Sequence, residues 1–148
     1  MKIYTASSWK NKYYDNVVKR LKKEGFDVYD FRSAISTEGQ TQAFDWNQIN
    51  TYWEQWTRKE FLDVLIHNKL AVNAFESDLK GMQEADACLL ILPCGRSAHI
   101  EAGYMKGLGK SLYIYMPELE RPELTYSLSD GIYQDLEVLV ANLKRWNR

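Results

Sequence analysis

The segment Ala87–Pro93, with the sequence ACLLILP, constrains the fold of this chain more than any other. It is a short and nearly continuous run of apolar residues, and a loop of small and polar residues, Cys94–Ser97, follows it directly. Such a run is typical of a central strand in a parallel sheet, because helices cover both faces of that strand. The sequence therefore predicts an α/β fold built on a buried parallel sheet.

Strands and helices alternate on both sides of this run, which is the unit of a parallel sheet. Before it, the patterns predict a strand at Lys2–Thr5, a helix that carries Tyr14, Val17, Val18 and Leu21 and stops at Gly25, and a strand at Phe26–Phe31. After it, they predict a helix at Ala98–Leu108 that Gly109 stops, a strand at Leu112–Met116, a short strand at Gly131–Tyr133 and an amphipathic helix over 132–146.

The middle of the chain is aromatic and partly helical. Ser33–Thr41 is polar and predicts a loop, and Phe44–Trp56 carries several aromatic residues, in part at helical spacing. Residues 58–70 are amphipathic, and Asn73–Glu84 predicts a helix with Asp78 inside it or near its start.

The bulk composition excludes several classes of protein. A net charge of −1 argues against general binding to a nucleic acid polymer or to an anionic membrane. The two cysteines, Cys88 and Cys94, suggest no disulfide framework, and with the lack of a secretory signal they favour a reducing, cytoplasmic location. His99 has no metal-ligand spacing to either cysteine, so neither a metal nor a cofactor is expected.

Open parallel sheets bind ligands beyond the carboxyl ends of their strands. Three loops lie there: Ala6–Asn11, the residues from Arg32 onward, and Cys94–Ser97. The third loop leads into a helix, whose free backbone N–H groups suit an anion. Ser97 fits the N-cap of this helix, which is an alternative to a role in binding.

Two carboxylates are candidates for catalysis. Glu101 lies about one helical turn past the third loop, and the small residues around it suggest close packing or a ligand. The alternative is an acid that the helix dipole stabilises in the first turn. Asp78 precedes the central strand, and its alternative is an ordinary solvated or N-terminal acid.

Three segments of the chain form an ordered set: Lys2–Asn11 (KIYTASSWKN), Phe75–Asp86 (FESDLKGMQEAD) and Pro93–Lys110 (PCGRSAHIEAGYMKGLGK). Taken together, they resemble the nucleoside 2-deoxyribosyltransferase superfamily, which includes the deoxynucleoside 5′-monophosphate N-glycosidases. The resemblance spans nearly the whole chain, and its specific part pairs an acid in FESD with the glutamate in EAGY. It implies a single domain over residues 1–148 with an open five-stranded parallel sheet, flavodoxin- or Rossmann-like, and helices on both faces.

The resemblance also implies roles for individual residues. The nucleophilic glutamate falls on Glu101, the aspartate that handles protons at the nucleobase on Asp78, and the tyrosine that steadies the nucleophile on Tyr4. In the monophosphate hydrolases the 5′-phosphate lies against a serine before the glutamate and against the first loop. Those positions correspond here to Ser97 and to Ser7, Ser8, Trp9, Lys10 and Asn11.

The loop after the central strand departs from that of the transferases, which carries acids and amides. Here Gly95, Arg96 and Ser97 bring no acid, and Lys10 adds positive charge in the first loop. This favours hydrolysis of a deoxynucleotide over base exchange between deoxynucleosides, while a non-catalytic nucleotide-binding module stays a third reading. Arg96 in a structural ion pair and Lys10 as a solvated residue are the alternatives at those two positions.

Two further expectations concern the base and the assembly. Trp46 is expected to stack on the nucleobase, and the alternative is a satellite core under a long connection. In the superfamily a segment after the fourth strand reaches into the neighbouring subunit's site. Glu123–Asp130 lies at that position, which predicts a homodimer or larger homo-oligomer with shared active sites and with Glu123, Tyr126 or Ser127 near the partner's site.

Overall fold

The computed structural model of the chain describes residues 1–33 and 43–147. The chain divides into two compact units. The sheet unit consists of Met1–Asp30 and Met82–Arg148, and the inserted unit is Phe31–Gly81. Most of the predicted loop at Ser33–Thr41 lies outside the described residues.

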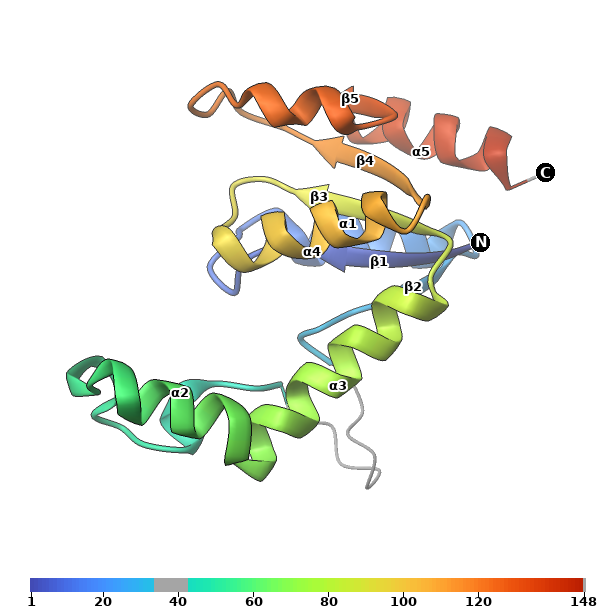
Figure 1. Ribbon diagram of the computed structural model, residues 1–148. Coiled ribbons are helices and arrows are strands. Elements are labelled where there is room, and N and C mark those ends of the chain that lie inside the picture. Colours follow the sequence, from blue (N-terminus) through green and yellow to red (C-terminus); the bar gives the residue numbers. More distant parts are fainter. Residues whose placement is uncertain (34–42, 148) are drawn as a thin grey trace. The chain divides into compact units, whose positions relative to one another are not determined.

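A parallel sheet of five strands in the order β2-β1-β3-β4-β5 forms the centre of the sheet unit (Figure 1). The apolar run that predicted the fold forms β3, the middle strand, and all of its residues are buried. The prediction of a five-stranded parallel sheet is thereby confirmed. The strands are β1 (Lys2–Ala6), β2 (Asp27–Tyr29), β3 (Ala87–Ile91), β4 (Ser111–Tyr115) and β5 (Gly131–Tyr133).

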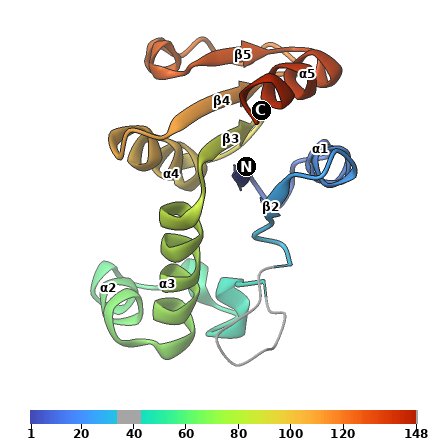
Figure 2. The same ribbon diagram turned by 90° about the vertical axis from the view of Figure 1, so that its right-hand side faces the viewer.

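Helices cover both faces of this sheet: α1 (Tyr14–Lys23), α4 (Arg96–Gly107) and α5 (Leu136–Trp146). Figure 2 shows α1 and α5 on one side and α4 on the other. The step from β1 to β2 and the step from β3 to β4 run in opposite directions across the sheet. Because both crossovers are right-handed, their helices must lie on opposite faces.

Contacts between side chains agree with this arrangement. Thr5 Oγ1 on β1 lies 2.7 Å from Tyr14 OH on α1, so Thr5 points to the α1 face. Arg20 Nη2 on α1 lies 2.7 Å from Glu137 Oε2 on α5, which joins the two helices. The buried side of α1 consists of the apolar residues that the sequence predicted, and Gly25, at φ +84°, follows its end.

The C-terminal helix differs from its prediction. It begins at Leu136 with Asp135 as its N-cap, whose carboxylate accepts hydrogen bonds from two backbone N–H groups. The prediction of a helix from residue 132 was wrong because Gly131–Tyr133 pairs with β4 instead. The apolar positions that follow, Leu139, Val140 and Leu143, are buried as expected.

The inserted unit holds two short 3₁₀ helices, η1 (Trp46–Gln48) and η2 (Trp53–Gln55), the helix α2 (Arg58–His67) and most of α3 (Lys69–Glu84). Asn68 separates α2 from α3, because its side-chain oxygen accepts hydrogen bonds from the N–H groups of Leu70 (3.0 Å) and Ala71 (3.2 Å). The helix predicted at Asn73–Glu84 therefore begins four residues earlier, at Lys69. Within the described ranges no helix combines the length and the apolar character that crossing a membrane needs.

Candidate active site

Two of the three predicted loops are tied together beyond the carboxyl ends of β1 and β3. Asn11 Nδ2 donates to the carbonyl oxygens of Ile91 and Pro93, both at 3.0 Å, and Ser7 Oγ donates to Ile91 O at 2.8 Å. Asn11 Oδ1 accepts from the N–H of Tyr13 at 2.7 Å, so both ends of this buried amide are engaged by backbone. Asn11 therefore fixes the shape of the site.

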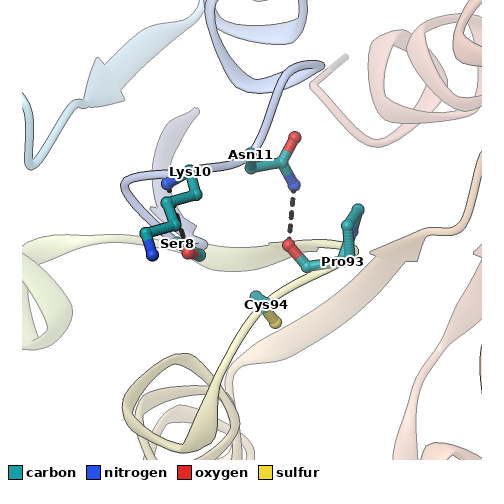
Figure 3. A pocket seen from close by; sticks show the side chains of 5 residues that line it. All are labelled: Ser8, Lys10, Asn11, Pro93 and Cys94. Carbon is teal, nitrogen blue, oxygen red and sulfur yellow. Dashed lines mark hydrogen bonds between the residues drawn. The ribbon is translucent and has the colours of Figure 1, made fainter.

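A pocket of about 240 Å³ lies between these loops. Figure 3 shows its lining, with Ser8, Lys10 and Asn11 from the first loop and Pro93 and Cys94 from the second. The backbone N–H of Lys10 donates to Ser8 Oγ at 3.3 Å, while the Lys10 ammonium has no ion pair within the part of the chain that the structure describes. The pocket thus presents a positive charge from Lys10, the hydroxyl group of Ser8 and backbone polar groups.

With Ser97 as its N-cap, α4 would begin at Ala98, but it begins at Arg96. Gly95 is the N-cap and makes no side-chain cap hydrogen bond, so the prediction of Ser97 as N-cap was wrong. Arg96 and Ser97 occupy the first turn with exposed side chains, and neither forms a hydrogen bond or ion pair with any described residue. A glycine N-cap has no side chain that could accept from the first N–H groups of this helix, and such groups suit an anion.

Glu101 is half-buried and lies in the second turn of α4, between the buried Ala98 and Ala102. The alternative of an acid held in the first turn by the helix dipole does not apply, because no acidic residue lies in that turn. Burial, then Glu120, then Glu101 raise the pKa of the Cys94 thiol to about 12. Burial and, after it, Glu101 also raise the pKa of Cys88 on β3. The carboxylate of Glu101 therefore disfavours the ionised forms of the Cys88 and Cys94 thiols at the sheet.

Tyr4 lies on the same face of the sheet as α4. It is buried, with 1% of its surface exposed, and it pairs in register with Cys88 of β3. Register partners in neighbouring strands share a face, and Thr5, the next residue along β1, points to α1. Tyr4 and Cys88 therefore face α4, the helix that carries Glu101.

The inserted unit holds two further predicted site residues. Asp78 is the tenth residue of α3 and half-buried, so it lies inside the helix, and the reading as an acid of its first turn is wrong. Trp46 packs edge-to-face on Phe44, Trp56 and Phe61, at ring-centroid distances of 4.8, 6.0 and 5.9 Å. These four rings form an aromatic cluster within the inserted unit, and none of them is fully buried. The pairing of Asp78 with Glu101 and the stacking of Trp46 on a base stay predictions.

The segment after β4 contacts its own chain. Its short 3₁₀ helix, η3 (Leu124–Leu128), has Glu123 as its N-cap, whose carboxylate accepts from Thr125 N at 3.2 Å and Thr125 Oγ1 at 3.0 Å. Tyr126 OH lies 2.9 Å from His99 Nε2 on α4, and Ser127 is exposed. Contact of these three residues with a partner's site stays a prediction.

Sequence reasoning missed two residues near the second loop. His99 was weighed only as a metal ligand, although it lies one helical turn after Gly95 and returns a hydrogen bond to that residue's carbonyl. Glu120 carried no motif, yet its charge acts on Cys94 and, after burial and Cys94, raises the pKa of Tyr126. Spacing alone indicates the first of these contacts, and nothing local indicates the second.

Neither a scan of family models nor a search of curated proteins finds a match for this chain. Among the solved structures that match it, two do so over nearly its whole length. One is the 2-deoxyribosyltransferase of the psychrotolerant bacterium Bacillus psychrosaccharolyticus, with a TM-score of 0.63 and 20% identity over 95% of this chain and 90% of that chain. The other is the CMP N-glycosidase of Clostridium botulinum, with a TM-score of 0.52 and 14% identity over 97% of this chain and 99% of that chain.

This chain therefore shares the fold of these two proteins. This confirms the architecture that the resemblance implied. In this fold the carboxyl ends of β1 and β3 form one edge of the sheet, where the first loop, the start of α4 and the pocket meet.

Proposed function

We propose that this protein is an enzyme that hydrolyses the N-glycosidic bond of 2′-deoxynucleoside monophosphates, with Glu101 as the nucleophile. The observation that carries the proposal is the placement of the Glu101 carboxylate. This carboxylate lies one turn beyond the start of α4, and its charge helps to raise the pKa of the Cys88 and Cys94 thiols at the sheet. A carboxylate held there suits attack on a sugar carbon better than it suits a solvated helix surface.

The proposed reaction has two steps. In the first, a carboxylate oxygen of Glu101 bonds to C1′ while the bond from C1′ to the base nitrogen breaks, and a second acid gives a proton to the departing base. In the second, water attacks C1′ and gives a proton back to that acid, while the ester bond to Glu101 breaks. The products are the free base and deoxyribose 5-phosphate, with the configuration at C1′ retained.

Tyr4 and Asp78 have supporting roles in this proposal. Tyr4 lies buried on the face of α4, where a phenol O–H suits a hydrogen bond to the nucleophilic carboxylate. Asp78 is the second acid in the superfamily pattern. Glu120 is a second candidate for that role, because its charge and that of Glu101 act on the same thiol, Cys94.

The phosphate preference rests on the groups around the pocket. Arg96 and Ser97 are exposed in the first turn of α4, and Lys10 lines the pocket. An arginine, an ammonium and uncapped helix N–H groups suit a dianionic 5′-phosphate. The second structural neighbour, named as a CMP N-glycosidase, agrees with a nucleoside monophosphate as substrate.

The alternative is base exchange between deoxynucleosides, which the likeness to a 2-deoxyribosyltransferase favours. In that case a second base, in place of water, captures the sugar from Glu101. A homodimer or larger assembly with shared active sites and a cytoplasmic location belong to either version of the proposal. Analytical ultracentrifugation tests the assembly.

The deciding experiment incubates the protein with each deoxynucleoside monophosphate and separates the products. Free base without an added acceptor supports hydrolysis, whereas base exchange with a free purine and no hydrolysis supports the transferase. Glu101→Gln should lower turnover about a thousandfold or more while nucleotide binding persists. The matched control, Glu54→Gln, removes an exposed carboxylate of the inserted unit and should leave turnover unchanged. If the wild type binds nucleotides but shows no turnover, the protein is a non-catalytic nucleotide-binding module.

A further inference from the structure

His99 and Tyr126 form a contact that the proposed reaction does not use. Their rings stack at 5.8 Å with an interplanar angle of 13°, and His99 Nε2 lies 2.9 Å from Tyr126 OH. On its other side, His99 Nδ1 lies 2.7 Å from the carbonyl oxygen of Gly95 and 3.6 Å from Cys94 Sγ. The imidazole thus bridges η3 and the loop after β3.

The partners of the imidazole settle where its hydrogen lies. A carbonyl oxygen only accepts, so Nδ1 carries the hydrogen, and Nε2 of the neutral ring accepts from Tyr126 O–H. Burial raises the pKa of Tyr126 to about 12, so its phenol keeps its hydrogen at neutral pH. Because Nδ1–H ends on a backbone carbonyl, the pair has no path to hand a proton to a substrate.

The carbonyl that His99 holds belongs to the N-cap of α4. A trans peptide is planar, and its N–H points away from its C=O. The bond from His99 to Gly95 O therefore also sets the direction of the Arg96 N–H, the first helical N–H of α4. Rotation of this peptide would turn that N–H away from its present direction.

We propose that His99 is a positioning residue for the loop Gly95–Ser97 and that Tyr126 locks it, so that η3 helps to shape the site of its own chain. As a role in substrate binding, this rests on the proposed function. It assigns Tyr126 a task within one chain, in addition to any contact with a partner. Substrate affinity should then depend on the bond between the Tyr126 hydroxyl and His99.

Hydrogen exchange and nucleotide binding test the proposal together. The variants are His99→Ala, Tyr126→Phe, the double variant, and Tyr104→Phe as the control, each confirmed as folded by its circular dichroism. Tyr104 lies on the same helix, and its hydroxyl accepts only a 3.4 Å hydrogen bond from Gln83 among the contacts described. Binding of each deoxynucleoside monophosphate is measured in a Glu101→Gln background, where turnover does not interfere.

We expect Tyr126→Phe to speed exchange in residues 95–98 as well as in 124–129, whereas Tyr104→Phe leaves both segments unchanged. Nucleotide Kd should rise about two- to tenfold in each single variant, the loss that one ordinary hydrogen bond gives. The double variant should bind no more weakly than His99→Ala, and with Glu101 present KM should rise more than kcat falls.

Unchanged exchange at residues 95–98 in both His99→Ala and Tyr126→Phe would overturn the positioning role. Faster exchange together with an unchanged nucleotide Kd would also overturn it, because the loop would then move without affecting the substrate. If the wild type binds none of these nucleotides, the proposed substrate class is wrong, and the exchange data still decide whether the lock exists.

Discussion

Asn11 Nδ2 donates a hydrogen bond to the carbonyl oxygen of Pro93 at 3.0 Å, across a separation of 82 residues in sequence. The same nitrogen donates to Ile91 O, and Asn11 is buried with 4% of its surface exposed. One amide therefore holds both loops of the candidate active site, and water has little access to replace it.

Replacement of Asn11 should destabilise the protein. Asn11→Leu removes the donor to Pro93 O and one of the two donors to Ile91 O, together with the acceptor for the Tyr13 N–H, which costs about 1–3 kcal/mol in the free energy of unfolding. Urea unfolding measures this cost. Asn16→Ala, at an exposed position of α1, is the control and should change the free energy by about 0.5 kcal/mol or less. A cost for Asn11→Leu as small as that of the control would show that the two loops hold their positions without this amide.

The ion pairs between α1 and α5 predict a pH-dependent stability. Lys144 and then Arg20 lower the pKa of Glu24 to about 2, from an ordinary value of 4.5. A carboxyl with a lowered pKa adds stability above its unfolded pKa and loses it as pH falls through the folded pKa. The contribution of Glu24 should therefore be full above pH 4.5 and fade between pH 4.5 and 2.

Glu24→Gln removes this contribution. The variant should have a lower urea midpoint than the wild type at pH 6, and the two midpoints should converge as pH falls towards 2. The difference at pH 6 should be small, because solvent still reaches Glu24, which is half-buried, and its exposed partner Lys144. A constant difference from pH 6 to pH 2 would show that the change comes from packing and not from the charge of Glu24.

The sequence predicted the parts of the fold that local patterns encode. The ACLLILP run requires burial on both faces, and Gly25 and Gly109 follow helix ends at φ +84° and +79°, as glycines permit. The prediction of Ser97 as the N-cap of α4 was wrong because Asn11, from a distant loop, holds the residues before this helix. Capping preferences do not include such a long-range contact.

In the candidate site, too, local patterns indicate some features while others depend on long-range contacts. A motif makes Glu101 a candidate, but the common face of Tyr4 and the helix that carries Glu101 depends on the register of β1 with β3, which no local pattern encodes. The contact of His99 with Tyr126 joins residues 27 positions apart without periodicity. Such contacts follow from tertiary packing, which a single sequence does not display.

The thiol of Cys94 should report the charge of Glu101. Its pKa of about 12 leaves it protonated at neutral pH, so alkylation by iodoacetamide should be slow. Glu101→Gln removes a negative charge that disfavours the thiolate, and the rate should rise severalfold. Glu120→Gln should raise the rate at least as much, because Glu120 has the larger effect on this pKa.

Mass spectrometry locates the label, since Cys88 is fully buried and should stay unlabelled. Glu54→Gln, in the inserted unit, is the charge-matched control and should not change the rate. If Glu101→Gln labels no faster than the control, the carboxylate does not face Cys94, and the placement that supports the nucleophile fails.

Two basic groups, Lys10 in the pocket and Arg96 at the start of α4, should distinguish nucleotides from nucleosides. Arg96→Ala should raise KM for a deoxynucleoside monophosphate about tenfold or more, because a charge-assisted contact to phosphate is lost. Lys10→Ala should act in the same direction. Neither change should affect KM for the matching deoxynucleoside, which has no phosphate, and Arg145→Ala on α5 should affect neither substrate. An equal rise in KM for both substrates would show that Arg96 and Lys10 do not bind the phosphate.

The second acid can be identified by the leaving group. Asp78→Asn should slow release of an ordinary base about a hundredfold or more, the usual effect of losing general acid assistance. The same variant should lose far less with the monophosphate of 7-methyl-2′-deoxyguanosine, whose cationic base leaves without needing a proton. Single-turnover base release measures both substrates in Asp78→Asn and Glu120→Gln.

If the selective loss appears in Glu120→Gln and not in Asp78→Asn, Glu120 is the acid, and the superfamily pattern does not carry over to Asp78. Equal losses with both substrates in both variants would contradict acid assistance by either residue, because a missing proton donor must matter most for the base that needs the proton.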